Sequence, residues 1–164
     1  MDYMSRALDK AREALGISSP NPPVGAVLVK DGVIVGEGHT MPPGESHAEI
    51  IALRQAGSEA RGATLYTTLE PCCHYGRTPP CTREIISAGV SAISVGIIDP
   101  NPLVNGMGVF ELEKAGIETR LGEYGAQVSQ ICESYIKFIS TGLPFVVAKF
   151  AMSLDGKIAT KNGE

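Results

Sequence analysis

The sequence predicts an α/β fold, a three-layer α/β/α sandwich built around a mixed five-stranded sheet. Segments with helical period alternate with short β-branched runs along the 164 residues, and crossover helices of this kind join parallel strands. The first two strand-like runs are separated by Asp31-Gly32, which is a strong hairpin signal, so that pair is antiparallel. With 43% hydrophobic residues, the chain can bury a sizeable core.

The spacing of apolar residues predicts the helices and strands, and Pro and Gly residues mark where they end. Apolar residues spaced i, i+4, i+7 and i+11 from Met4 predict a first helix that ends at Gly16. Pro- and Gly-rich clusters mark the loops between the later elements. In chain order we expect helix 4–15, strands 24–29 and 33–38, helix 47–56, strand 64–69, helix 81–88, strand 92–98, helix 108–114, strand 117–121 and helix 126–141.

Composition and charge narrow the class of protein. The chain has 14 basic and 18 acidic residues, a net charge of −4, which argues against a nucleic-acid binder and favours a small-molecule substrate. The N-terminus lacks the apolar core of a secretory signal, and the composition is not that of a membrane protein. We therefore expect a cytoplasmic protein whose four cysteines stay reduced or bind metal.

Three short segments carry the residues of a zinc site. They supply the His47 imidazole, the Cys72 and Cys81 thiolates, and a carboxylate at Glu49. Three nitrogen and sulfur ligands leave one position of a tetrahedral zinc open for water, and His-x-Glu with spaced cysteines is typical of zinc deaminases. Helix starts at His47, Cys72 and Cys81 would favour the thiolate forms. The pattern predicts one catalytic zinc per chain, with Glu49 as the general acid and base.

Each of these residues has a plainer interpretation. Ser46-x-x-Glu49 matches a capping box, in which Glu49 would only start a helix. Cys73 and His74 are the local candidates for a fourth ligand, which would make the zinc structural. Cys73 adjoins Cys72, and two adjacent cysteines rarely bind one tetrahedral ion without strain, so we interpret Cys73 as a bystander.

The loop between the two cysteines is more specific than the His-x-Glu motif, because Cys72 and Cys81 are separated by eight residues. Four motifs are informative together: Pro20-Asn21-Pro22-Pro23-Val24-Gly25, His47-Ala48-Glu49, Glu70-Pro71-Cys72-Cys73-His74-Tyr75-Gly76-Arg77-Thr78-Pro79-Pro80-Cys81 and Asp99-Pro100-Asn101-Pro102. On these motifs the chain resembles the pyrimidine deaminase domain of the bifunctional riboflavin-biosynthesis deaminase/reductase family, within the cytidine-deaminase-like superfamily. The resemblance covers residues 1–142. The sequence departs from the family at Cys73, where the family more often has serine.

The resemblance implies a cytidine-deaminase-like sandwich and a specific reaction. The substrate would be 2,5-diamino-6-(5-phosphoribosylamino)pyrimidin-4-one, which loses its 2-amino group as ammonia to give 5-amino-6-(5-phosphoribosylamino)uracil. Zinc would activate the water. Glu49 would take the water's proton, pass it to a ring nitrogen and assist the departure of the amine.

Substrate contacts are expected from the loops. Asn21 can pair with the edge of a pyrimidine, although an Asx turn is the alternative. His74 and Arg77 are expected to contact the ribose-phosphate tail, as the resemblance also implies; otherwise His74 supports a ligand and Arg77 is a solvated charge. His39 could line the pocket or only end a strand, and Cys132 is expected to be a small core residue.

We predict two parts in this chain. Residues 1–142 form the zinc-dependent deaminase domain, and residues 143–164 are the first strand and turn of a truncated reductase domain. Residues 145–151 predict a buried strand, which resembles the first strand of the family's reductase domain. Lys149 and Ala151 would match reductase substrate and nucleotide positions, so NADPH binding is expected only with the rest of that domain. We expect a truncated or split enzyme without reductase activity. We also expect a homo-oligomer, with dimerisation through residues 145–151 as one hypothesis and a separate reductase chain as a further partner.

Two other functions remain open at this point. A related zinc deaminase could act on another nucleotide or on a tRNA adenosine, although the acidic balance argues against RNA. A non-catalytic module could use zinc only for folding, in which case no ammonia would be released.

Overall fold

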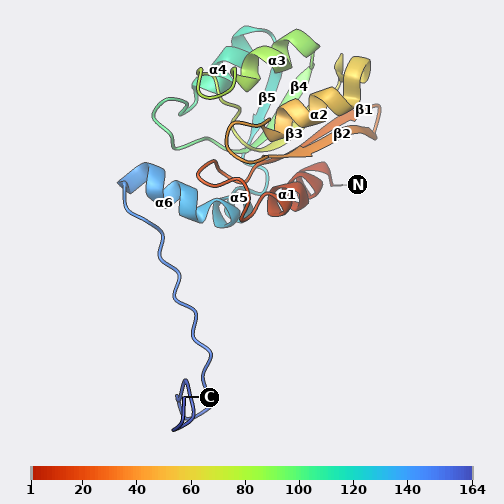
Figure 1. The fold of residues 1–164 in the computed structure, drawn as a ribbon. Coiled ribbons are helices and arrows are strands. Elements are labelled where there is room, and N and C mark those ends of the chain that lie inside the picture. The colour runs from red at the N-terminus through yellow and green to blue at the C-terminus, as the bar shows by residue number, and fades with distance from the viewer. Residues whose placement is uncertain (1, 164) are drawn as a thin grey trace.

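The computed structural model describes residues 2–163, and its elements form a sheet covered by helices on both faces (Figure 1). The strands are β1 (Gly25–Lys30), β2 (Val33–His39), β3 (Thr64–Leu69), β4 (Ala92–Ile97) and β5 (Glu118–Leu121). The helices are α1 (Tyr3–Glu13), α2 (Ala48–Ala56), the 3-10 turn η1 (Gly57–Ala60), α3 (Cys81–Ala88), α4 (Met107–Lys114), α5 (Gly125–Ile131) and α6 (Glu133–Thr141).

The sheet has the order β2-β1-β3-β4-β5. Strand β1 pairs antiparallel with β2 and with β3, whereas β3, β4 and β5 are mutually parallel. The predicted mixed five-stranded sheet and the hairpin at Asp31-Gly32 are therefore confirmed. Helices α2, α3 and α4 cover one face, and α1, α5 and α6 lie on the other (Figure 1).

The core lies on both faces of the sheet, as the side chains of β1 show. In β1, Ala26 and Leu28 belong to the cluster packed against α2, whereas Val27 and Val29 pack with Met4 of α1. This alternation follows from the two-residue period of a strand, and it explains why β1 is an almost continuous apolar run. The larger cluster, on the α2 side of the sheet, includes residues of α2 and α3, the two helices that begin at the candidate metal ligands His47 and Cys81.

Helix α2 lies unusually close to β2. A Cβ atom added to Gly38 would come within 2.3 Å of the Ala48 carbonyl oxygen, and one added to Gly36 within 2.1 Å of that of Ala52. No real side chain fits such gaps, so only glycine permits this approach. The first turn of α2, which begins directly after His47, is thereby held against the sheet.

Two helix predictions needed correction. The first helix ends at Glu13, because Ala14 to Gly16 form a turn in which Gly16 has a φ of 82°. The predicted helix 126–141 is broken at Cys132, whose φ and ψ are −92° and 8°. The Cys132 side chain is buried, as expected of a core residue, and its Sγ donates a hydrogen bond to the Pro23 carbonyl oxygen at 3.7 Å. The break lets α5 pack on the sheet while α6 turns toward the loops beyond it.

The predicted strand over residues 145–151 is wrong. Residues 143–163 contain no strand, are exposed, and extend away from the sheet (Figure 1). The physical reason is that a single strand cannot satisfy its backbone groups without a neighbour, and no described strand lies beside it.

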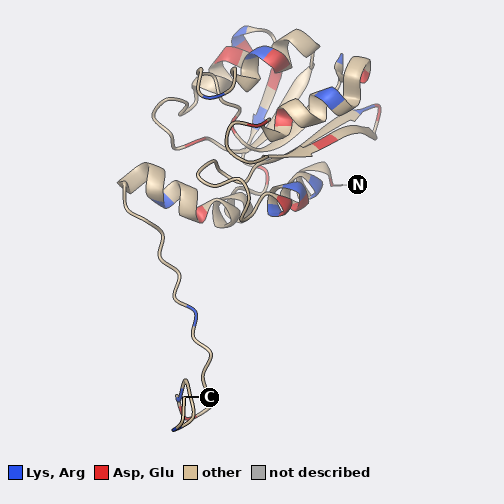
Figure 2. Ribbon diagram, in the orientation of Figure 1, with Lys and Arg blue, Asp and Glu red and all other residues tan. Residues whose placement is uncertain are grey.

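The charged side chains are mixed in sign. Figure 2 shows basic and acidic residues side by side along α1, where Arg6 pairs with Glu37 at 2.7 Å and Lys10 with Glu13 at 3.0 Å. Within residues 2–163, no helix has the length and apolar character needed to cross a bilayer.

Candidate active site

The candidate site lies at the edge of the sheet where β3 and β4 end. Because β1 runs antiparallel to β3, the start of β1 meets the end of β3, and the Gly25 N–H donates to Thr68 Oγ1 at 3.1 Å. The end of β2 reaches the same edge, where the Thr40 N–H donates to the Val24 carbonyl oxygen at 2.9 Å. Loops that are far apart in sequence therefore converge, as is usual for sites of α/β sheets.

The three predicted metal ligands meet at this edge. One ligand atom each from His47, Cys72 and Cys81 lies within 4.8 Å of the other two. His47 Nδ1 is 3.6 Å from Cys72 Sγ and 3.3 Å from Cys81 Sγ. Among the described residues, this is the cluster of histidine, cysteine and acidic side chains that could hold a metal ion.

The spacing of these atoms fits zinc. With Zn–N and Zn–S bonds of ordinary length, tetrahedral geometry separates a nitrogen and a sulfur ligand by about 3.6 Å. The two measured nitrogen–sulfur distances, 3.6 and 3.3 Å, agree with that value. One imidazole and two thiolates are also a donor set that zinc favours over magnesium or calcium.

Helix starts position two of these ligands. His47 is the N-cap residue of α2, and Cys81 is the first residue of α3. Cys72 does not precede a helix in sequence, contrary to the prediction, but the Cys81 N–H donates to Cys72 Sγ at 3.4 Å. The helix start that favours the Cys72 thiolate therefore belongs to α3, and it is brought there by the fold.

The thiols of Cys72 and Cys81 have pKa values shifted in opposite directions. A hydrogen bond with Cys81, followed by one with His47, lowers the pKa of Cys72 to about 4. The same contact with Cys72, together with burial, raises the pKa of Cys81. Because both sulfurs must be thiolates to bind a metal, metal binding would release a proton from this pair.

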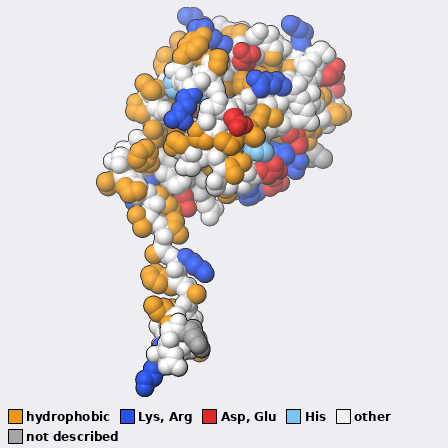
Figure 3. Space-filling view, in the orientation of Figure 1, with side chains coloured by type: hydrophobic (Ala, Val, Ile, Leu, Met, Phe, Trp, Pro, Cys, Tyr) orange, Lys and Arg blue, Asp and Glu red, His pale blue; other side chains and the backbone are white. Residues whose placement is uncertain are grey.

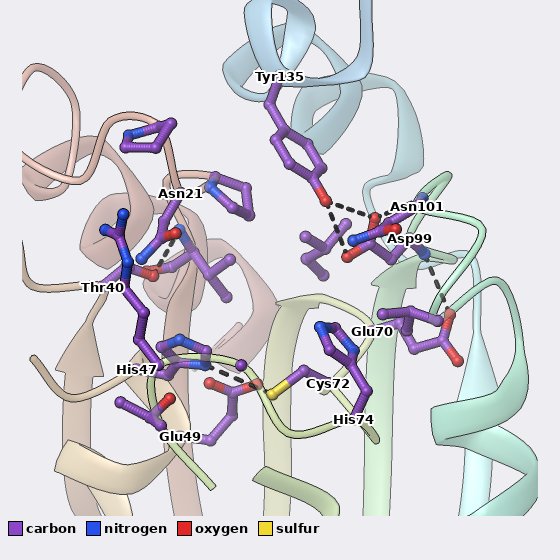
Figure 4. Close-up of a pocket in the computed structure, with 18 of the residues that line it drawn as sticks. Asn21, Thr40, His47, Glu49, Glu70, Cys72, His74, Asp99, Asn101 and Tyr135 are labelled. Atoms are coloured by element: carbon purple, nitrogen blue, oxygen red, sulfur yellow. Dashed lines mark hydrogen bonds between the residues drawn. The ribbon is translucent and has the colours of Figure 1, made fainter. Parts of the chain in front are cut away.

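Glu49 stands next to this group but is not one of its ligands. It is buried, and burial raises its pKa to about 7. Figure 4 shows its carboxyl group beside the His47 ring and the Cys72 sulfur. The alternative of a capping box is wrong, because His47 is the N-cap and Ser46 Oγ accepts a hydrogen bond from Arg54 at 2.7 Å.

A pocket of about 250 Å³ opens over His47, Glu49 and Cys72. This is near the lower end of ligand-site volumes, ~300–1,000 Å³, and suits a small ring with its substituents. All three predicted substrate contacts line it, namely Asn21, His74 and Arg77.

The surroundings of these three residues leave their side chains available. Asn21 is held by its main chain, since its N–H donates to the Ser18 carbonyl oxygen at 2.8 Å and its own carbonyl accepts from Ser18 Oγ at 3.1 Å. Among the described residues, no hydrogen bond involves the Asn21 side-chain amide, so that amide does not form an Asx turn. His74 Nδ1 is buried without a hydrogen-bond partner among the described residues. Such an atom needs a partner, which a ligand in the pocket could provide.

The pocket includes polar residues that the sequence analysis did not assign to the site: Thr40, Glu70, Thr78, Asp99, Asn101 and Tyr135. Tyr135, on α6, donates its O–H to Asp99 Oδ1 at 2.9 Å (Figure 4). Burial raises the pKa of Asp99. Polar residues directly after β4 were a usable signal, because loops at the ends of parallel strands build sites. Nothing in the local sequence marked Tyr135.

Other candidate residues lie elsewhere. His39 does not line the pocket, and its Nδ1 is 3.4 Å from Glu13, so the alternative of a strand-end histidine is correct. Cys73 Sγ donates to the Leu103 carbonyl oxygen at 3.7 Å and is not in the metal group. Lys149 and Ala151 lie in the extended segment, exposed to solvent.

A family model described as the cytidine and deoxycytidylate deaminase zinc-binding region matches residues 1–97, which is more than half of the chain. The chain belongs to this deaminase family. The matched part contains the three candidate ligands and Glu49. The family resemblance expected from the sequence and the cytidine-deaminase-like fold are both confirmed.

Individual members of the deaminase family resemble the whole chain. The riboflavin biosynthesis protein RibD of Aquifex aeolicus is 48% identical over 162 residues, which cover 99% of this chain and 46% of the relative. The structure of Acinetobacter baumannii RibD, form 1, has a TM-score of 0.92 and 48% identity, covering 99% of this chain and 46% of that one.

A third match names two activities. The structure of a diaminohydroxyphosphoribosylaminopyrimidine deaminase/5-amino-6-(5-phosphoribosylamino)uracil reductase from Thermotoga maritima has a TM-score of 0.91 and 45% identity, covering 99% of this chain and 47% of that one. The chain therefore spans about half the length of the relatives that it matches.

Proposed function

We propose that the chain is a zinc-dependent hydrolase that deaminates 2,5-diamino-6-(5-phosphoribosylamino)pyrimidin-4-one. The products are 5-amino-6-(5-phosphoribosylamino)uracil and ammonia. The observation that carries the proposal is the convergence of His47, Cys72 and Cys81 on one point, with the buried Glu49 beside them and a pocket over both. The similarity to the Thermotoga maritima enzyme supports this substrate.

The pocket residues suit a phosphorylated pyrimidine. Asn21 offers both a donor and an acceptor to the ring edge, and Asp99 and Asn101 provide further polar atoms on the wall beyond β4. Arg77 and His74 come from the loop between the two thiolates, and a guanidinium is the side chain best matched to a phosphate.

In the proposed mechanism, His47, Cys72 and Cys81 would hold a zinc ion, which would supply a Lewis acid able to activate water. Glu49 accepts one proton from the attacking water and delivers it to the ring nitrogen. It then transfers the second proton of that water, from the hydroxyl group now on the ring carbon, to the leaving amine, and ammonia departs. Burial brings the pKa of Glu49 to about 7, so the carboxyl group can both take and release a proton near neutral pH. Asn21 keeps the ring in place during this exchange.

The direct test combines metal analysis with an ammonia-release assay. The purified chain is expected to contain one zinc ion and to release ammonia from the diaminopyrimidine ribosyl phosphate. Treatment with a chelator should abolish the release, and added zinc should restore it. A chain that binds zinc but yields no ammonia would exclude the proposed reaction and favour a structural zinc module.

The role of Glu49 gives a separate prediction. We expect Glu49→Gln to retain zinc, because Glu49 is not in the ligand group, and to lose at least about 10²-fold in kcat, the usual contribution of a general acid/base. Glu84→Gln, an exposed residue of α3, is the matched control and should keep wild-type activity. Equal activity of the two variants would contradict the assignment.

A deaminase of another nucleotide, or of a tRNA adenosine, is the competing proposal. It is less favoured because the net charge of −4 offers little attraction to RNA and because Arg77 lies in a small pocket. Comparison of the candidate substrates in the same ammonia assay separates these activities.

The remaining expectations concern the wider protein. We propose that residues 143–164 begin a reductase domain, in which Lys149 and Ala151 would take part in substrate and NADPH binding only together with the rest of that domain. We also propose a homo-oligomer working in the cytoplasm, where the ligand thiols stay reduced. Whether a separate reductase chain serves as partner can be tested by co-purification.

A further inference from the structure

Glu70 is a buried acid for which the proposed chemistry provides no role. It follows β3 directly and lies two residues before Cys72, with 3% of its surface exposed. An ionised carboxylate can only accept hydrogen bonds, and burying one without partners is costly. Its partners therefore indicate what it does.

All three hydrogen bonds to the Glu70 side chain come from the backbone of one distant segment. Oε2 accepts from the N–H groups of Asp99 at 3.1 Å and Gly106 at 2.9 Å, and Oε1 accepts from that of Val109 at 3.0 Å. These donors span the loop that leaves β4 and the first turn of α4. Figure 4 shows the hydrogen bond from the Asp99 N–H to the Glu70 carboxylate.

Glu70 also replaces the missing cap of α4. The N-cap residue of α4 is Gly106, which has no side chain to accept a hydrogen bond, and no side-chain cap is present. Val109 is the third residue of the helix, the position that an N-cap side chain normally satisfies. A carboxylate at this end also complements the helix dipole.

Helix α4 lies directly on the backbone beside Glu70. A Cβ atom added to Gly108 would come within 2.2 Å of the Pro71 carbonyl oxygen and 3.1 Å of Glu70 Oε1. The segment that leads to Cys72 and the start of α4 are thus in contact without an intervening side chain. Glycine at this position permits the approach that lets Glu70 reach Val109.

We propose that Glu70 is a positioning residue. It holds residues 99–106, which form one wall of the pocket, at a fixed place relative to the segment that carries Cys72. Asp99, Asn101 and Val104 of that wall line the pocket across from Asn21. Glu70 fixes the main chain of Asp99, while Tyr135 fixes its carboxyl group. Glu70 also lines this pocket, but its carboxylate is bonded to the backbone of that wall, so we expect it to control substrate binding through the wall, an effect that rests on the proposed function.

The first test does not depend on that function. In Glu70→Gln, an NH₂ donor replaces one of the two acceptor oxygens, so at least one of the three N–H groups loses its partner. Backbone amide exchange of Asp99, Gly106 and Val109, followed by NMR, is expected to accelerate about tenfold, which corresponds to the loss of one buried hydrogen bond. Glu84→Gln makes the same chemical change on an exposed side chain and should leave these amides unchanged. Unchanged exchange in Glu70→Gln would overturn the proposal.

The second test asks what the loosened wall does to the site. We expect Glu70→Gln to retain one zinc per chain and to raise KM for the diaminopyrimidine ribosyl phosphate about tenfold, with a smaller change in kcat. Loss of zinc, or a fall in kcat alone, would overturn the assignment to the substrate wall. If the wild-type chain releases no ammonia, the proposed function fails, and the amide exchange still decides the role of Glu70.

A second variant covers the case in which Glu70→Gln does not fold. Gly108→Ala keeps the carboxylate but pushes the start of α4 away from Pro71. It is expected to show the same faster exchange at Gly106 and Val109 and the same rise in KM with zinc retained. A Gly108→Ala protein with wild-type KM and exchange would overturn the proposal.

Discussion

Asp99 illustrates how a single residue of the site depends on its surroundings. It is buried at the end of β4, and Oδ1 accepts both the Tyr135 O–H and the Asn101 N–H, each at 2.9 Å. Burial nevertheless raises its pKa, which means that the ionised form is disfavoured in the folded protein. Asp99 lines the pocket, so the charge of this part of the pocket wall depends on pH.

This shift predicts a pH-dependent difference in stability. In the unfolded chain Asp99 titrates at about 3.9. Because its folded pKa is higher, the stability that protonated Asp99 contributes is fully present below about pH 3.9 and is lost as pH rises through the folded pKa. Asp99→Asn keeps an acceptor at Oδ1 and does not ionise. Its Tm relative to wild type should thus increase between pH 4 and pH 7, as measured by circular dichroism.

The matched control for Asp99 is Asp9→Asn, since the Asp9 side chain on α1 is 53% exposed. Its Tm difference from wild type should change less over the same pH range. A falling relative Tm of Asp99→Asn toward neutral pH would contradict the sign derived from burial.

At the scale of elements, α6 is held by few contacts. None of its residues is fully buried, although Tyr135 and Ile136 are partly buried against the core clusters. The Tyr135–Asp99 hydrogen bond is the specific link between α6 and the pocket (Figure 4). Helix α6 is therefore expected to be among the less stable parts of the fold.

Removal of that hydrogen bond tests the role of α6. We expect Tyr135→Phe to lower the free energy of unfolding by about 1–2 kcal/mol, the range for a hydrogen bond to a charged or polar partner, while the ring keeps its packing. Backbone amides of α6 should exchange faster, as measured by NMR. Tyr124→Phe, in which an exposed hydroxyl contact with Asp2 is lost, is the control and should leave α6 unchanged. Unaltered exchange in Tyr135→Phe would exclude this anchoring.

The contact between β2 and α2 gives a second prediction for elements. Gly38→Ala would place a Cβ atom 2.3 Å from the Ala48 carbonyl oxygen, next to His47 and Glu49. Overpacking of this kind costs about 1–3 kcal/mol. We expect lower stability together with weaker zinc binding, measured by competition with a chelator. Gly125→Ala, whose Cβ would meet only ordinary contacts at 3.6 Å, should retain both properties.

For the whole molecule, the outstanding feature is the segment that follows α6. Residues 143–163 are exposed, and apolar side chains follow one another along them (Figure 3). Val146, Val147 and Phe150 are 74–78% exposed, far more than such side chains usually are in a folded domain. An exposed segment rich in β-branched and aromatic residues favours pairing with another chain.

Deletion of residues 143–164 tests this pairing. If the segment joins chains, the shortened protein should have a smaller mass by light scattering than the full chain. Its Tm should be almost unchanged, because the described part of the segment has no buried residue. An unchanged mass would reject association through residues 145–151.

Much of this arrangement could be predicted from local patterns. The hairpin followed from Asp31-Gly32, since its backbone requirement lies within the turn itself, and both of these residues have positive φ. The metal ligands followed from residue types that have few other reasons to occur together, such as His47 with Cys72 and Cys81. Information of this kind is contained in neighbouring residues.

Other features could not be predicted, because they depend on contacts between distant segments. The Cys81 N–H that reaches Cys72 and the Tyr135 hydroxyl group that reaches Asp99 both come from elements placed by the sheet. The strand predicted at 145–151 failed for the same reason, since a strand needs a neighbour that local sequence does not reveal.

The sequence by itself determined the fold class, the hairpin and the identity of the zinc-ligand candidates, because turn chemistry, apolar period and donor type are local properties. Only the tertiary structure decided which loops form the pocket, why Glu49 has a raised pKa and what Glu70 holds in place. The physical reason is that burial and hydrogen-bond partners depend on where the chain folds back on itself, whereas residue chemistry does not.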